Sequence, residues 1–147
     1  MPNRHTNIVR GATHTVRSKD GTTISYLSLG TGPAVLVVPG VLSMASDYAA
    51  FTGALAEQFT VHTIERRGRG ESGPQGDDYS MVKECEDVLA LQQKTGASFL
   101  VGHSYGGLVA LEVGRLNKAF TKIAYHVKEQ WIPFRIRQEG SEFSYKS

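Results

Sequence analysis

Short apolar runs alternate with longer segments of helical periodicity along most of this chain. Residues 13–17 and 22–29 have the pattern of strands, and Asp20-Gly21 between them is a pair that favours a β-hairpin turn. Residues 34–38 are apolar at every position, which is typical of a central parallel strand buried on both faces. The chain therefore begins with a hairpin that leads into the middle of a sheet.

The rest of the pattern predicts three helices separated by strands. In residues 46–59 the apolar positions recur at steps of three and four, and Gly96 stands where a helix over residues 80–94 would end. Strands that alternate with helices of this length indicate an α/β fold, with right-handed crossovers and a mostly parallel sheet of about six strands. The remaining predicted elements are a helix over residues 104–116 and strands over residues 60–64, 98–101 and 121–125.

Composition excludes several classes of protein. The 147 residues suffice for one domain, and 40% hydrophobic with 20% charged residues is neither disordered nor fibrous. Apolar runs are too short to cross a bilayer, and no apolar leader follows the N-terminus, so we expect neither a membrane protein nor a secreted one. The single cysteine, Cys85, excludes an internal disulfide and fits a reducing, cytoplasmic location.

The charge is uneven but does not indicate a nucleic-acid-binding surface. The net charge is +2, and the basic excess lies after residue 117, where six basic and three acidic residues are spread over a tail. Such spacing is more typical of a solvated segment than of a nucleic-acid arm, which remains the alternative for this tail. The histidines are scattered and no cluster has metal-ligand spacing, so we expect neither a metal nor a cofactor.

One motif carries chemistry. The segment Gly102-His103-Ser104-Tyr105-Gly106 matches Gly-x-Ser-x-Gly between a predicted strand and a predicted helix. A sharp turn at this place would hold the serine in a strained conformation and present its hydroxyl above the sheet edge. Small residues at positions 102 and 106 allow other backbone to approach closely. The motif predicts a serine nucleophile.

With this motif the sequence resembles the α/β-hydrolase superfamily of serine hydrolases, over about residues 12–125. The segment Val-Val-Pro-Gly-Val resembles the strand and oxyanion loop, with Pro39 where histidine is usual. The segment Glu-Arg-Arg-Gly-Arg-Gly-Glu-Ser resembles the glycine-rich loop after the next strand, with Glu65 where aspartate is usual. A helix that bears Asp87 is also typical. The matching blocks are residues 37–41, 65–72, 78–80 and 100–107.

The resemblance implies a role for several residues. Ser104 would attack the carbonyl group of a small ester, thioester or amide, and the backbone N–H groups of Tyr105 and Val41 would form the oxyanion hole. We call the strand-to-helix turn at Ser104 the nucleophile elbow. In such a tight turn the side chain of His103 would point away from Ser104, so we expect a packed or surface histidine rather than the base. Ser72 and the arginines of the glycine-rich loop are expected to be structural, with the arginines pairing with nearby carboxylates or carbonyls.

The acid and the histidine of the triad are not found in their usual places. The triad order in this superfamily is serine, acid, histidine, and only 43 residues follow Ser104. Completing the sheet takes at least two more βα units of about 30 residues each. The one histidine in this stretch, His126, would lie at the active-site edge of the sheet as an improvised base, with Glu129 to orient it. In the alternative, His126 begins a non-native or flexible tail.

We therefore expect a partial α/β-hydrolase domain over residues 1–125, truncated after the helix that follows Ser104, and an irregular tail over residues 126–147, from a truncated or frameshifted gene. The uncovered sheet edge would favour self-association. The favoured function is hydrolysis of a small-molecule substrate by Ser104, weak or absent in this chain. The alternatives are a non-catalytic remnant that binds a partner through its sheet edge, and nucleic-acid binding through the tail.

Overall fold

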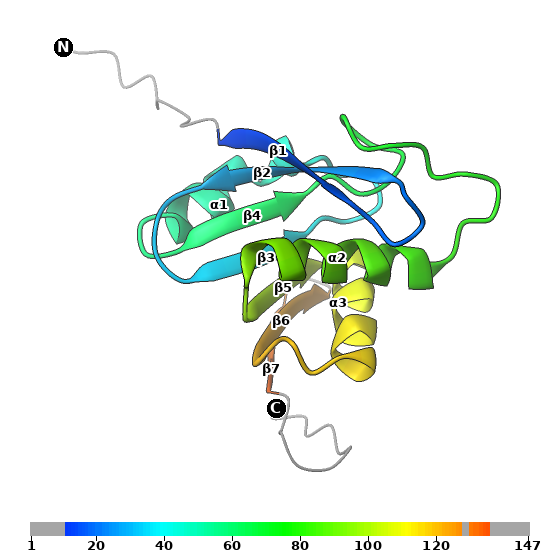
Figure 1. The fold of residues 1–147 in the computed structure, drawn as a ribbon. Helices are drawn as coiled ribbons and strands as arrows, with labels where there is room; N and C mark the ends of the chain where they lie inside the picture. The colour runs from blue at the N-terminus through cyan, green and yellow to red at the C-terminus, as the bar shows by residue number, and fades with distance from the viewer. Residues whose placement is uncertain (1–10, 128–129, 136–147) are drawn as a thin grey trace.

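Seven strands form one mixed sheet in a computed structural model that describes residues 11–127 and 130–135 (Figure 1). The strand order is β1-β2-β4-β3-β5-β6-β7. Their bounds are β1 Ala12–Arg17, β2 Thr23–Leu29, β3 Ala34–Val38, β4 Thr60–Ile64, β5 Phe99–His103, β6 Lys122–Val127 and β7 Gln130–Arg135.

The four central strands, β4, β3, β5 and β6, are parallel to one another. At one side β1 and β2 form the predicted hairpin and continue antiparallel onto β4; at the other side β7 pairs antiparallel with β6. The predicted α/β fold with a mostly parallel sheet is thus confirmed. Because the central strands share one direction, their carboxyl ends lie along one edge, where such sheets bind ligands.

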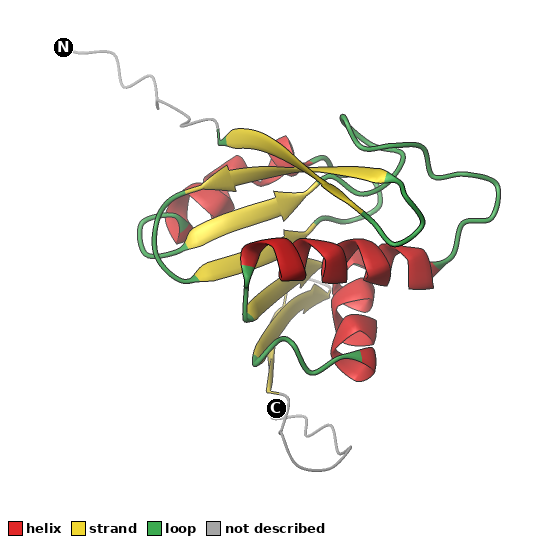
Figure 2. Ribbon diagram, in the orientation of Figure 1, coloured by secondary structure: helices red, strands yellow, loops and turns green. Residues whose placement is uncertain are grey.

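Helices cover both faces of the sheet. Cys85, Val88 and Leu91 of α2 pack on the face that bears Leu36, in one cluster with residues of α3. Helix α1 lies over the opposite face of the sheet (Figure 2). There Phe51 and Leu55 pack on Val35, Val37 and Val61. The helices are α1 Ala49–Leu55, α2 Met81–Thr95 and α3 Tyr105–Leu116, with the 3₁₀ helix η1 Ala45–Tyr48 before α1.

The predicted helix ends agree best where a cap fixes them. Ser80 caps the N-terminus of α2, where its hydroxyl accepts a hydrogen bond from Lys83 N–H, and Gly96 ends the helix at φ 70°. The helix predicted over residues 46–59 is instead divided into η1 and α1. Its last residues leave the helix, because Thr60 N–H donates to the Pro33 carbonyl at 3.0 Å as β4 begins beside β3.

The chain after residue 125 is more regular than the sequence indicates. Strand β6 runs on to Val127, and β7 lies within the segment 126–147 that the sequence predicts to be irregular. The described sheet has seven strands, where the sequence predicts about six. The backbone of β7 forms because it pairs with β6, whose outer edge is otherwise open. Residues 128–129 and 136–147 lie outside the described residues, and the predicted division at residue 125 stays a prediction. Within the described ranges, no helix is long and apolar enough to cross a bilayer.

Candidate active site

The predicted nucleophile lies in a sharp turn between β5 and α3. Ser104 is exposed and has φ 55° and ψ −120°, and no other described residue apart from glycines has a positive φ. A side chain in this region of backbone space costs about 1–3 kcal/mol and persists only where the surrounding structure holds it. The turn therefore has the strained geometry that the motif predicts.

Gly102 and Gly106 permit this turn, because neighbouring backbone occupies the space that a side chain at either position would need. A Cβ atom on Gly106 would lie 2.1 Å from the Val38 carbonyl oxygen, at the end of β3. A Cβ atom on Gly102 would lie 2.3 Å from the Gly106 carbonyl oxygen. The first turn of α3 is thus held directly against β5 and β3, which places Ser104 over the sheet edge.

The loop after β3 lies beside the nucleophile. A Cβ atom on Gly40 would lie 3.3 Å from Ser104 Cβ, so the two segments are in contact. Val41 follows in a turn, and Tyr105 is the first residue of α3, where a backbone N–H has no acceptor within the helix. Among the described residues, neither of these two N–H groups has a hydrogen-bond acceptor. Their role as an oxyanion hole stays a prediction.

His103 is tied into the site by its side chain. Its Nδ1 atom lies 2.7 Å from Tyr48 Oη, and the two rings meet edge to face with 5.5 Å between centroids. The ring is half-buried, as expected for a packed histidine. Burial, and secondarily the nearby His126, lower the pKa of the His103 imidazole and so favour its neutral form.

Strand β6 brings His126 to the nucleophile. In the parallel register His126 is opposite His103, with 5.1 Å between ring centroids. The His126 carbonyl accepts a hydrogen bond of 2.9 Å from Ser104 N–H. The predicted location of His126 at the active-site edge therefore agrees with the backbone, whereas its role as base is untested. Glu129, its predicted orienting acid, lies outside the described residues.

Glu65, which stands where the resemblance leads one to expect aspartate, lies beneath the loop that contains Val41. Its Oε1 atom accepts a hydrogen bond of 3.0 Å from Ala45 N–H, and within the described residues Oε2 has no partner. Burial raises the pKa of this carboxyl despite the Ala45 hydrogen bond. Gly70 leaves room for the carboxyl, since a Cβ there would lie 2.9 Å from its carbon.

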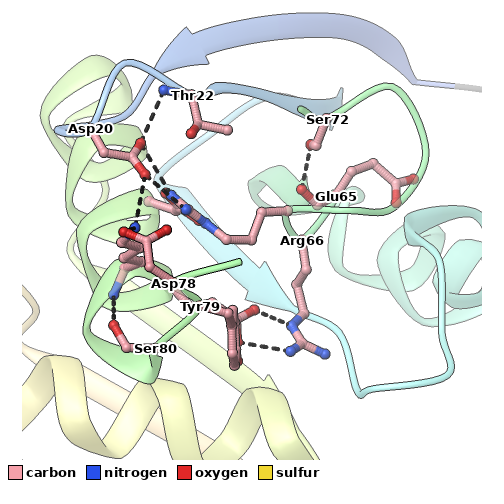
Figure 3. Close-up of polar contacts among 12 residues, drawn as sticks. Asp20, Thr22, Glu65, Arg66, Ser72, Asp78, Tyr79 and Ser80 are labelled. Carbon is pink, nitrogen blue, oxygen red and sulfur yellow. Dashed lines mark hydrogen bonds and ion pairs between the residues drawn. The ribbon is translucent and has the colours of Figure 1, made fainter. Parts of the chain in front are cut away.

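A polar cluster contacts Tyr105, the residue after Ser104, from the side of α2. Figure 3 labels two of its members, Arg66 and Tyr79. Arg66 Nη2 donates to Glu84 Oε2 at 2.8 Å, and the same carboxylate accepts a hydrogen bond from the Tyr79 hydroxyl. Tyr79 Oη lies 2.8 Å from Tyr105 Oη, and the Arg66 guanidinium lies 4.6 Å from the centre of the Tyr105 ring. The prediction that the loop arginines pair with carboxylates or carbonyls is confirmed, since Arg66 and Arg67 bind carboxylates and Arg69 binds the Val41 carbonyl. The sequence does not predict the contacts of Tyr79 and Glu84, although Tyr79 lies in the matching block 78–80.

Ser72 and Arg67, two further polar residues of the glycine-rich loop, also have structural contacts. Ser72 Oγ donates to the Glu65 carbonyl at 2.6 Å and accepts from Ser25 N–H at 2.8 Å, which fastens the loop to β2. Arg67 is buried and binds Asp87 of α2 together with Asp20 of the β1–β2 turn. The hydrogen bond from Arg67 holds the pKa of the Asp20 carboxyl well below its usual range. This loop therefore joins the hairpin, the sheet and α2.

Comparison with known proteins identifies relatives of this fold. A family described as "Alpha/beta hydrolase family" matches residues 35–135. A solved alpha/beta hydrolase from Sphaerobacter thermophilus is 37% identical with a TM-score of 0.72, over 76% of this chain and 44% of the other. A solved N-formylmaleamic acid deformylase from Pseudomonas putida is 30% identical with a TM-score of 0.71, over 78% of this chain and 46% of the other.

One curated protein is also similar to part of this chain. Bifunctional epoxide hydrolase 2 of Sus scrofa is 30% identical over 96 residues, which is 62% of this chain and 17% of the relative. The chain thus spans less than half the length of each of these three relatives. The match to the family, over residues 35–135, covers β3 to β7 and includes the Ser104 turn and the loop at Gly40.

Proposed function

Because the chain belongs to the alpha/beta hydrolase family, we propose that its site hydrolyses a small ester, thioester or amide with Ser104 as the nucleophile. The observation that carries this proposal is the exposed Ser104 side chain at φ 55°, in contact with the Gly40 loop at the carboxyl ends of the parallel strands. A backbone strained at a single serine, in this place, favours a reactive role over a packing role.

In the proposed reaction Ser104 Oγ bonds to the substrate carbonyl carbon as a base takes the hydroxyl proton. The carbonyl oxygen becomes an oxyanion, which the N–H groups of Val41 and Tyr105 would stabilise by roughly 3 kcal/mol each in the transition state. The start of α3 adds partial positive charge at the same place. The bond to the leaving group then breaks, and water releases the acid from the acyl-enzyme by the same steps.

His126 is the proposed base, since its strand end is hydrogen-bonded to Ser104 and it is the one histidine after Ser104 in the sequence. It would receive the serine proton and deliver it to the leaving alcohol, thiol or amine. We propose that turnover by this chain is weak. If the oxyanion hole and binding act alone, the acceleration is at most of order 10³–10⁴ over water.

The relatives favour a small-molecule substrate, and the name of the P. putida relative describes removal of a formyl group from an acid. A serine at the elbow favours acyl transfer over dehalogenase-type chemistry, which uses an aspartate there. We also propose a reducing, cytoplasmic location. This rests on Cys85, which is the single cysteine of the sequence and so leaves no internal disulfide.

The test is hydrolysis of a short activated ester by the purified chain over a range of pH. We expect Ser104→Ala to lower the rate at least about tenfold, to the buffer background, since the acyl-enzyme can no longer form. The matched control is Ser46→Ala, which removes the hydroxyl of an exposed serine on η1. It should keep the wild-type rate.

The proposed role of His126 as the base is tested by a variant in the same assay. His126→Ala should lower the rate of ester hydrolysis toward that of Ser104→Ala, because the serine proton then has no acceptor. If wild type and Ser104→Ala both stay at background while circular dichroism shows folded protein, the hydrolase proposal is wrong for this chain. The alternative, a non-catalytic protein that binds a partner or a second copy through the β1 or β7 edge, would then take its place.

A further inference from the structure

We propose that Tyr48 is a positioning residue for the loop beside the nucleophile, and that it acts by binding Gly40 N–H and His103 Nδ1 at the same time. This inference rests on the proposed function, because it assigns to Tyr48 the placement of the Val41 N–H group at the reacting carbonyl. Tyr48 would not touch the substrate. Nothing in the sequence motif points to it, since it lies on η1, outside the matching blocks.

The hydrogen bonds of the Tyr48 hydroxyl connect two segments of the site. Gly40 N–H donates to Tyr48 Oη at 3.0 Å, so this bond uses an acceptor position of the phenol. Tyr48 Oη also lies 2.7 Å from His103 Nδ1, and the direction of that bond depends on the His103 tautomer. We assign the phenol as the donor, which puts the ring proton of His103 on Nε2. One phenol thus connects the loop after β3 to the residue that precedes the nucleophile.

Polar anchors are needed here because apolar packing does not hold the loop. Val41 and Met44 are each 44% exposed and Leu42 is 98% exposed, so burial of their side chains contributes little to fixing the backbone. Side chains bind the loop instead. Apart from Tyr48, they are Arg69 on the Val41 carbonyl at 2.9 Å, Asp47 on Met44 N–H at 2.8 Å and Glu65 on Ala45 N–H at 3.0 Å.

Of these hydrogen bonds to the loop, the one with Tyr48 is made at Gly40, which is in contact with Ser104. A Cβ on Gly40 would lie 3.3 Å from Ser104 Cβ and 3.6 Å from His103 Nδ1. A shift of Gly40 therefore changes the distance between Ser104 and Val41 N–H directly. Oxyanion donors are effective only within about 2.7–3.1 Å of the charge that develops, so a small shift has a large effect on rate.

The experiment compares wild type with Tyr48→Phe, which keeps the ring and removes the hydroxyl. A fluorophosphonate reacts with activated serines, and its rate is measured as a function of probe concentration. We expect the maximum rate of Ser104 labelling to fall about tenfold, the value of one hydrogen bond of this kind, with the half-saturating probe concentration unchanged. Tyr26→Phe, at a buried tyrosine of β2, is the control and should react like wild type.

A second measurement does not depend on reactivity. In wild type, the imidazole ¹⁵N shifts of His103 should show a proton on Nε2, and the Gly40 amide proton should be shifted downfield and slow to exchange. In Tyr48→Phe the Gly40 amide should move upfield and exchange faster, while the rest of the spectrum stays that of a folded protein. Unchanged Gly40 and His103 signals, or equal labelling rates of Tyr48→Phe and wild type, would overturn the inference.

Failure of the proposed function looks different. If wild type labels no faster than Ser104→Ala, the hydrolase proposal fails and the positioning role with it. If wild type labels at Ser104 and Tyr48→Phe does so equally fast, the hydrolase proposal stands and the inference alone is wrong. His103→Gln is the second variant: it should also slow labelling, and the double variant should be no slower than Tyr48→Phe, because both residues act through one hydrogen-bonded chain.

Discussion

Replacing Gly106 by alanine is expected to lower the free energy of unfolding by about 3 kcal/mol, the upper end of the usual cost of overpacking. The added Cβ would lie 2.1 Å from the Val38 carbonyl oxygen and 2.5 Å from that of Pro39. Both atoms belong to backbone at the end of β3, and no flexible side chain is available to move instead. Either α3 must shift from the sheet, or the end of β3 and the Gly40 loop must move.

Urea unfolding followed by circular dichroism measures this effect. The matched control is Gly53→Ala in α1, where a Cβ would meet nothing within 4 Å. It should be neutral or stabilise the protein by roughly 0.5–1 kcal/mol, because alanine is a better helix former than glycine. Equal stability of Gly106→Ala and wild type would mean that α3 is not held against β3 as described.

Arg67→Met is expected to cost about 3–5 kcal/mol in the free energy of unfolding, because it leaves a buried carboxylate without its cation. Arg67 and Asp87 are 1% and 2% exposed, and they share two hydrogen bonds of 2.8 and 2.7 Å. Arg67 also binds Asp20 at 2.9 Å, so one side chain joins the glycine-rich loop, α2 and the hairpin turn. Methionine fills similar space without any of these bonds.

Three further variants test whether the cost comes from the buried ion pair. Arg115→Met removes an exposed pair with Glu112 on α3 and should cost less than about 1 kcal/mol. Arg67→Lys should not restore wild-type stability, since lysine lacks the planar fork that binds Asp87 twice. The double variant Arg67→Met, Asp87→Leu should recover part of the loss by removing the stranded charge. A cost below 1 kcal/mol for Arg67→Met itself would contradict the account of this pair.

The free energy of unfolding at acid pH should also depend on the contact between Arg67 and Asp20. The pKa of Asp20 is lowered by its hydrogen bonds, chiefly from Arg67, so its contribution to stability is present above the unfolded-state pKa of about 3.9 and is lost as pH falls below it. In Arg67→Met most of that loss has already occurred at neutral pH. The stability of the variant should therefore decrease less steeply with acid than that of wild type.

The sequence predicts those parts of the fold that depend on local signals. Alternation with Asp20-Gly21 identifies the hairpin, Gly96 identifies the end of α2, and the all-apolar run of β3 identifies a central strand. The elbow is equally local, since glycines at 102 and 106 make room for the strained Ser104. In each case a few adjacent residues determine the backbone.

The remaining features depend on partners distant in the sequence. Strand β7 has little pattern of its own and is formed by pairing with β6, while α1 ends at Leu55 because the chain then turns to start β4 beside β3. Likewise Tyr48 meets His103 across 55 positions, and Arg66 meets Glu84 across 18. Periodicity and motif carry no information on which distant side chains face one another, so these contacts could be found only in the structure.

The proposed role of Ser104 as an activated nucleophile can be tested directly by mass spectrometry of the fluorophosphonate-treated chain. We expect one adduct per chain, mapped by peptide analysis to Ser104, absent from Ser104→Ala and absent when the protein is unfolded in urea before treatment. An intact, folded chain that carries no adduct, or carries it on a residue other than Ser104, would mean that Ser104 is not an activated nucleophile.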